Sequence, residues 1–179
     1  MTKKLILLRH AKSYWGENGR FQFKGDDHDR PLNERGRKTK KLMSQYFLDK
    51  NISVDFIFSS TAKRATETLL PFKNKLISHF GYETHKKLYT FNYHDLLTFT
   101  KRINDKYQKV MLISHNPGIQ DFCLEYVINK QNNPDFEKLK QKFPTCAVAI
   151  LLSNTKNWSS IDKKGFELKK FIIPKSIGD

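Results

Sequence analysis

Short apolar runs alternate along the chain with longer amphipathic segments. The runs at 5–8 and 110–113 contain only aliphatic residues and methionine, which is typical of strands buried on both faces of a parallel sheet. Between such runs, apolar residues spaced by three or four indicate helices, most clearly from Ala62 to Phe80. The pattern predicts strands at 3–9, 54–59, 85–90, 109–114, 146–153 and 166–172, and helices at 33–49, 61–80, 93–106 and 117–129.

This order of elements predicts an α/β fold. Strands that alternate with helices form a mostly parallel central sheet flanked by helices on both faces, which gives three layers. The last two strands have only the loop 154–165 between them, so we expect an antiparallel pair at the C-terminal edge of the sheet. No linker or internal repeat divides residues 1–179, and the pattern predicts a single domain.

Side chains suited to chemistry stand directly behind the apolar runs. Arg9 and His10 follow the first run, His115 follows the run at 110–113, and Arg64 begins the helix after the second strand. The carboxyl ends of parallel strands are where open α/β sheets place their ligands, so we expect these four residues to meet. A lone histidine at a strand end is often only a structural residue, but a second copy of the arrangement favours a site.

These four residue types meet the needs of phosphoryl transfer. A neutral imidazole can attack phosphorus at neutral pH, which makes His10 the candidate nucleophile. Arg9 and Arg64 offer planar, permanently charged groups for phosphate oxygens, and His115 would add a donor as imidazolium. Asn116 is a plausible N-cap, so His115 is also expected beside a helix N-terminus, which attracts anions.

Five segments together resemble the histidine phosphatase superfamily, also called phosphoglycerate mutase-like, and within it the small phosphohistidine phosphatase (SixA-like) branch. In the family's order they are LILLRHAKSYWG, DDHDRPLNERGR, DFIFSSTAKRATETL, VMLISHNPGIQDF and KFPTCAVAILL. The resemblance implies a phosphoglycerate mutase-like fold and a hydrolase that works through phospho-His10 without a metal or cofactor. It also implies that Arg9, Arg64 and His115 complete the catalytic core.

Further residues near the expected site have two interpretations each. Arg30 is as easily a surface ion-pair partner, but the resemblance favours a phosphate contact. Ser13 and the loop 14–24 are expected to line the mouth of the site. Aromatic residues of that loop are either substrate contacts or loop anchors, namely Trp15, Phe21 and Phe23.

The general acid is where this sequence departs from the wider family. Mutases and many phosphatases of the superfamily carry a glutamate after the third strand, but residues 85–93 contain no carboxylate. Asn116 stands where the acid phosphatases carry an aspartate. Asp27 or Asp29 remains, with Asp27 as the candidate proton donor. A phosphohistidine whose leaving imidazole arrives protonated needs no strong acid, which favours that substrate over a mutase reaction.

Composition narrows the class of protein. The chain has 33 basic and 18 acidic side chains, a net charge of +15, which would steer anionic substrates inward or simply cover a solvated surface. Cys123 and Cys146 suit buried thiols better than a disulfide or a zinc site. Apolar stretches at the N-terminus are too short for a signal peptide or a membrane span, so we expect a cytoplasmic protein.

The sequence thus predicts a phosphatase, most simply a monomer, that acts on a phosphohistidine of another protein without a specific nucleic acid or a membrane as partner. A phosphatase of a small phosphorylated substrate, a phosphomonoester, is the alternative. A different class also stays open, namely a non-catalytic basic domain that binds anions or nucleic acid.

Overall fold

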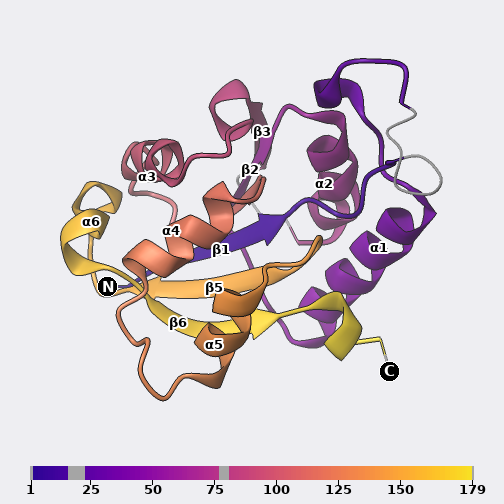
Figure 1. Ribbon diagram of the computed structural model, residues 1–179. Helices are drawn as coiled ribbons and strands as arrows, with labels where there is room; N and C mark the ends of the chain where they lie inside the picture. Colours follow the sequence, from indigo (N-terminus) through magenta and orange to yellow (C-terminus); the bar gives the residue numbers. More distant parts are fainter. Residues whose placement is uncertain (1, 16–22, 77–80, 179) are drawn as a thin grey trace.

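One six-stranded sheet forms the centre of the protein (Figure 1). The computed structural model describes residues 2–15, 23–76 and 81–178. Strands β1 to β4 pair in parallel, and β5 pairs antiparallel with both β1 and β6 at the C-terminal edge, which confirms the predicted α/β sheet. In the order β3-β2-β4-β1-β5-β6, the strands are Tyr82–His85, Phe56–Ser60, Lys109–Ser114, Lys3–Arg9, Val148–Ser153 and Glu167–Ile172.

Helices cover both faces of this sheet. Helices α1 (Glu34–Asp49) and α2 (Lys63–Leu76) lie on one face (Figure 1). The other face carries α3 (Tyr93–Lys101), α4 (Gly118–Tyr126), α5 (Pro134–Gln141) and the short α6 (Ile161–Lys164). Alternate residues of β1 serve the two cores: Ile6 packs in the cluster of α1 and α2, and Leu7 in the other. Burial on both faces explains why β1 is an unbroken apolar run.

Several predicted boundaries differ in the structure. The third strand is at 82–85 rather than 85–90, because 86–88 form a 3-10 turn, and the helix predicted at 93–106 ends at 101. The helix expected at 61–80 is described to 76, and 77–80 lie outside the described residues. Helix α5 is not predicted by the apolar pattern, because two turns show little periodicity. Its start has sequence signals, since Asn133 caps the helix and Pro134 is its first residue. Helix α6 lies in the segment predicted as loop.

The start of α1 is packed against the loop that leads away from His10. The side chain of Asn33 accepts a hydrogen bond from the Gly36 amide and so caps the helix, while the Asn33 amide donates to the Lys12 carbonyl at 3.0 Å. A β-carbon at Gly36 would lie 2.1 Å from the Lys12 carbonyl oxygen. Only glycine therefore allows this approach, which fixes the chain just after the first strand.

We predict that Gly36→Ala lowers the free energy of unfolding by about 1–3 kcal/mol, because either α1 or the Lys12 backbone must move. Urea denaturation measures the change. Lys38→Ala, an exposed position on the same helix, is the matched control and should stay within about 0.5 kcal/mol of wild type. Equal stability of Gly36→Ala and wild type would contradict the close approach.

Candidate active site

The carboxyl ends of three parallel strands bring the predicted residues together. Arg9 pairs with Ser114 in the register of β1 and β4, so His10 and His115 leave adjacent strands at the same level. Their ring centroids are 5.0 Å apart. Ser60, at the end of β2, lies 2.8 Å from His115 Nε2 through its hydroxyl. The sheet thus places both histidines at the edge where the sequence predicted a site.

His10 is buried and holds its proton on the nitrogen away from the site. Its Nδ1 lies 2.8 Å from the Ala11 carbonyl oxygen, which can only accept, so Nδ1 carries the hydrogen. Nε2 is then an unprotonated acceptor, and Arg64 Nε donates to it at 3.3 Å. Burial lowers the pKa of His10 well below its usual range, and the neighbouring His115 adds to this shift. The imidazole is therefore neutral and nucleophilic at neutral pH.

Arg64 connects His10 to the loop that carries Asp27. The guanidinium is only 1% exposed and lies in the first turn of α2. Its Nη1 donates to the Asp27 backbone carbonyl at 2.6 Å, and its Nη2 to the Asp27 carboxylate at 2.9 Å. Thr68 accepts the Ala11 amide at 3.0 Å and donates to the Arg64 carbonyl at 2.6 Å. One side chain thereby ties the chain after His10 to the helix that presents Arg64.

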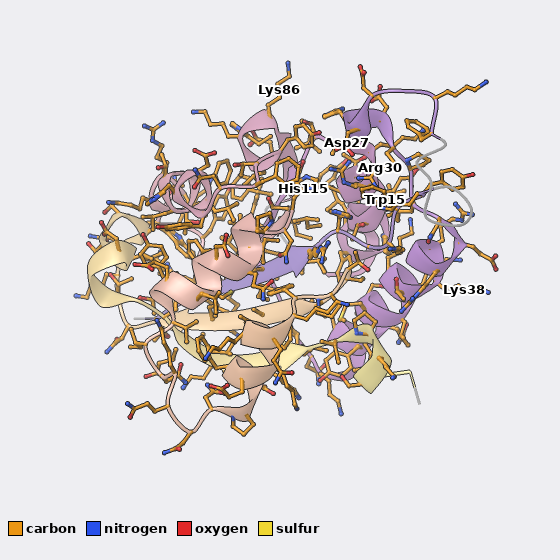
Figure 2. All side chains as sticks on the ribbon, viewed as in Figure 1. Trp15, Asp27, Arg30, Lys38, Lys86 and His115 are labelled. Atoms are coloured by element: carbon orange, nitrogen blue, oxygen red, sulfur yellow. The ribbon has the colours of Figure 1, made fainter. Side chains whose placement is uncertain are left out.

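Arg30 belongs to the same cluster and is not a surface residue. It is buried, and its guanidinium donates to Asp27 Oδ1 through Nε at 3.1 Å and Nη2 at 2.7 Å. Nη1 donates to the Ser13 hydroxyl at 2.8 Å. Trp15 stacks on the guanidinium at 4.1 Å, which makes this aromatic residue an anchor of Arg30 (Figure 2). Ser13 thus acts on the site through Arg30.

Asp27 is the point where both arginines meet, and Tyr89 is a third partner. The Tyr89 hydroxyl donates to Asp27 Oδ2 at 2.8 Å. Partial burial would raise the pKa of Asp27, but this hydrogen bond and the two guanidinium charges outweigh it. They lower the pKa of the carboxyl to about 2. Asp27 is therefore ionised at neutral pH in this arrangement, which favours a positioning role over the proton donation that the sequence suggested.

Tyr89 is a site residue that sequence reasoning did not single out. Its ring lies 5.2 Å from that of His115 and 5.7 Å from the Arg64 guanidinium carbon. The ring of Tyr89 also contacts that of His28 edge-on, with 5.1 Å between centroids. Nε2 of His28 lies 2.9 Å from the Thr61 hydroxyl. In the sequence, the segment around Tyr89 is informative only in that it lacks a carboxylate. No spacing pattern connects Tyr89 with the loop of Asp27.

His115 differs in one respect from the prediction. Burial, with the charge of Arg64 as the next cause, lowers its pKa to about 3, so it is neutral rather than an imidazolium in the ligand-free protein. The expected Asn116 cap is also absent, because α4 begins at Gly118 and the Asn116 amide donates to Gln120 instead. A bound phosphate would favour protonation of His115, since a nearby negative charge raises the pKa of an imidazole.

Two buried nitrogens of the site have no hydrogen-bond partner among the described residues. They are Nδ1 of His115 and Nε of Arg9. Arg9 is otherwise fixed by a bond from Nη1 to the Phe143 carbonyl at 2.6 Å, and its charge contributes to the lowered pKa of both histidines. Buried polar groups are rarely left unpaired, so these atoms fit a site whose ligand has oxygen acceptors. A tetrahedral oxyanion has the chemistry that this donor set requires.

The remaining predictions concern the mouth of the site, the thiols and metal ligands. Residues 16–22, which include Phe21, lie outside the described residues. Cys123 and Cys146 are buried free thiols, as predicted. Within the three described ranges, no group of three or more His, Cys, Asp or Glu side chains is placed to hold a metal ion. Among the same residues, no helix has the length and apolar character that a membrane span needs.

Comparison with known proteins agrees with this geometry. The model of the histidine phosphatase superfamily (branch 1) matches residues 5–121, which is more than half of the chain. The chain belongs to this superfamily. The matched region contains all the residues of the cluster from Arg9 to His115, and most of α4, helices α5 and α6 and strands β5 and β6 lie beyond it.

Individual proteins are similar to this chain over nearly its whole length. An uncharacterized protein of Mycobacterium leprae is 28% identical over 172 residues, which cover 94% of this chain and all of that protein. A candidate phosphohistidine phosphatase SixA from Nakamurella multipartitia has the same fold, with a TM-score of 0.80, 23% identity and 97% of both chains covered. A second candidate SixA, from Agrobacterium tumefaciens, gives a TM-score of 0.74 and 26% identity over 96% of this chain and 98% of that one.

The low pKa of His115 predicts a pH-dependent stability. The unfolded chain binds a proton on this histidine near its usual pKa of 6.5, whereas the folded protein binds it only near about 3. Between these values the unfolded state holds more protons, so stability falls as the pH falls through this window. His115→Asn should reduce that slope by about 1.4 kcal/mol per pH unit, as measured by urea denaturation over the window.

The exposed His94 on α3 offers the control for loss of an imidazole, and His94→Asn should be measured alongside. A slope in His115→Asn equal to that of wild type would show that His115 is not held neutral in the folded protein.

Proposed function

We propose that this protein is a phosphatase that forms a covalent phosphohistidine at His10. The observation that carries the proposal is the state of His10 Nε2, a deprotonated nitrogen fixed by the Nδ1 hydrogen bond and surrounded by buried guanidinium groups. Arg9, Arg30 and Arg64 supply positive charge of the kind that a metal ion supplies in other phosphatases, so the proposed reaction proceeds without a metal ion.

The first step transfers the phosphoryl group to the enzyme. Nε2 of His10 attacks phosphorus with its lone pair, the bond from phosphorus to the leaving group breaks, and the leaving atom keeps the electron pair. Arg64 Nε must exchange its hydrogen bond to Nε2 for one to a phosphate oxygen as the substrate enters. The unpaired Nε of Arg9 is a further donor available to the charge that develops, and Nδ1 of His115 donates as well once the substrate's negative charge favours the imidazolium.

The second step returns the nucleophile. A water molecule attacks phosphorus, the phosphorus–nitrogen bond to His10 breaks, and inorganic phosphate leaves. His10 recovers the lone pair on Nε2 while Nδ1 keeps its proton on the Ala11 carbonyl. The same donors stabilise both transition states, because both reactions occur at one phosphorus atom.

The proposed substrate is a phosphohistidine of another protein. Residues 86–92, which follow β3, contain no carboxylate. The carboxylate that bonds Arg64 and Tyr89 is that of Asp27, and it is ionised. A leaving imidazole that is already protonated departs without a proton from the enzyme, whereas an alkoxide does not. Similarity to two candidate SixA phosphatases supports the same class.

His10→Ala should lower kcat/KM by more than about 10³-fold, because it removes the nucleophile. Wild-type protein quenched in alkali during turnover should carry an acid-labile phosphate on His10, detected by mass spectrometry. A chelator should leave the rate unchanged. Phosphate on His115, or on no residue despite rapid quenching, would contradict the covalent mechanism. Binding of phosphate without turnover would instead support a non-catalytic anion-binding domain.

Asp27→Asn should lower kcat/KM by roughly 10–10²-fold and to a similar degree for aryl phosphates, alkyl phosphates and phosphohistidine, because Asp27 orients Arg30 and Arg64. Asp29→Asn is the matched control, since Asp29 is exposed and its side chain pairs, among the described residues, with His28 alone. A much larger loss with alkyl phosphates would show that Asp27 donates a proton. It would also favour a small phosphomonoester as the substrate.

A further inference from the structure

A second pocket opens beside the catalytic cluster. It has a volume of about 650 Å³ and lies between β2, β3 and α3, on the face of the sheet opposite α1 and α2. Tyr89 lines this pocket and also bonds Asp27 in the catalytic cluster, so one ring forms a wall of both sites. No residue assigned above to phosphoryl transfer other than Tyr89 lines it.

The floor of the pocket is an aromatic cluster. Phe58 packs against Phe56 at 4.6 Å and against Phe99 at 5.2 Å, and Tyr107 lies 4.7 Å from Phe56. His85 stacks edge-on against Phe99 at 5.1 Å. Aromatic rings that keep an accessible face of this kind suit an apolar or aromatic side chain of a ligand.

The rim of the pocket is basic. Lys86, Lys87 and Arg102 are exposed there, and Lys86 points away from the protein at the same end of the molecule as Asp27 and His115 (Figure 2). Two carboxylates also line the pocket, Glu83 and Asp95, and Asp95 accepts a hydrogen bond from the Thr90 hydroxyl at 2.6 Å. The three basic side chains outnumber these two acids. The rim therefore favours an acidic ligand, as does the net charge of +15.

We propose that this pocket binds an acidic segment of the phosphorylated partner protein and takes one aromatic side chain of that segment onto its floor. The proposal rests on the proposed function, because it needs the phosphohistidine of a partner protein to lie against His10 and the polypeptide of that partner to continue past Tyr89. A small phosphorylated metabolite held by the catalytic cluster would not extend over the Tyr89 wall. The pocket would then set which phosphohistidine proteins are good substrates, while the catalytic cluster sets the chemistry.

Two synthetic phosphohistidine peptides test this assignment. One carries Asp and Glu around a Phe placed about three to six residues from the phosphohistidine, a reach set by the span of an extended chain, and the other carries Gln and Ala at those positions. In wild type, kcat/KM for the acidic Phe peptide should exceed that for the neutral one by about tenfold, mostly through KM. The ratio within one protein removes differences in folding and in basal activity.

Two kinds of variant should bring this ratio close to one. The double charge reversal Lys87→Glu with Arg102→Glu removes the positive charge of the rim. Thr98→Trp, at an exposed pocket position on α3, fills the pocket without a change of charge. Lys38→Glu with Lys175→Glu makes the same change of charge on α1 and the C-terminal turn, which lie away from β3 and α3 (Figure 1), and should keep the tenfold ratio.

The outcomes separate the two proposals. A wild-type ratio near one, or a ratio that survives both pocket variants, overturns the pocket assignment and leaves the phosphatase function standing. Loss of the ratio in the control pair as well would mean that overall charge, not the pocket, selects the peptide. Wild type that cleaves an aryl phosphate but neither peptide contradicts the proposed substrate, and the pocket assignment with it. Competition by polyuridylate that the rim variant abolishes would assign the pocket to nucleic acid instead.

Discussion

The buried guanidinium of Arg64 is the constraint on which the site depends. A guanidinium does not give up its proton, so a group that is 1% exposed must have its charge balanced and its hydrogens bonded within the protein. His10 Nε2 and the two oxygens of Asp27 perform this task in the ligand-free structure. The same bonds hold His10, the Asp27 loop and helix α2 at fixed distances. A ligand can take over the bond that Arg64 Nε makes to His10 Nε2 only by offering an acceptor atom, and a negatively charged oxygen suits the guanidinium best.

The electrostatic balance of the cluster explains how two histidines can share it. Burial and the surrounding cations keep His10 and His115 neutral, so neither repels the other and His10 keeps a lone pair for attack. Asp27 is the one carboxylate that the described contacts place among these cations, and it is ionised. Asp27 thus balances part of the charge of Arg30 and Arg64 within the protein. Entry of a phosphoryl group then changes the partners of the arginines more than it changes the backbone.

Tyr89 gives the site a boundary with chemical consequences. On one side its hydroxyl donates a hydrogen bond to Asp27, and on the other its ring lines the aromatic pocket between β2, β3 and α3. The segment 86–91 therefore contributes residues both to the catalytic cluster and to the neighbouring surface. Two of these residues are the exposed lysines of the pocket rim. Specificity and catalysis can change separately in such an arrangement, because the groups that hold phosphate and the groups that hold the rest of a substrate come from different elements.

The sequence by itself determined the strands β1, β2 and β4, because apolar runs buried on both faces admit few other structures. It also indicated that Arg9, His10, Arg64 and His115 meet at one end of the sheet, because they follow those runs. Short elements such as α5 and α6 escaped it, since one or two turns show no clear period. Only the tertiary structure decided the ionised state of Asp27, the neutral state of His115 and the place of Tyr89. Each of these depends on burial and on charges brought from distant parts of the chain, which no local pattern of residues records.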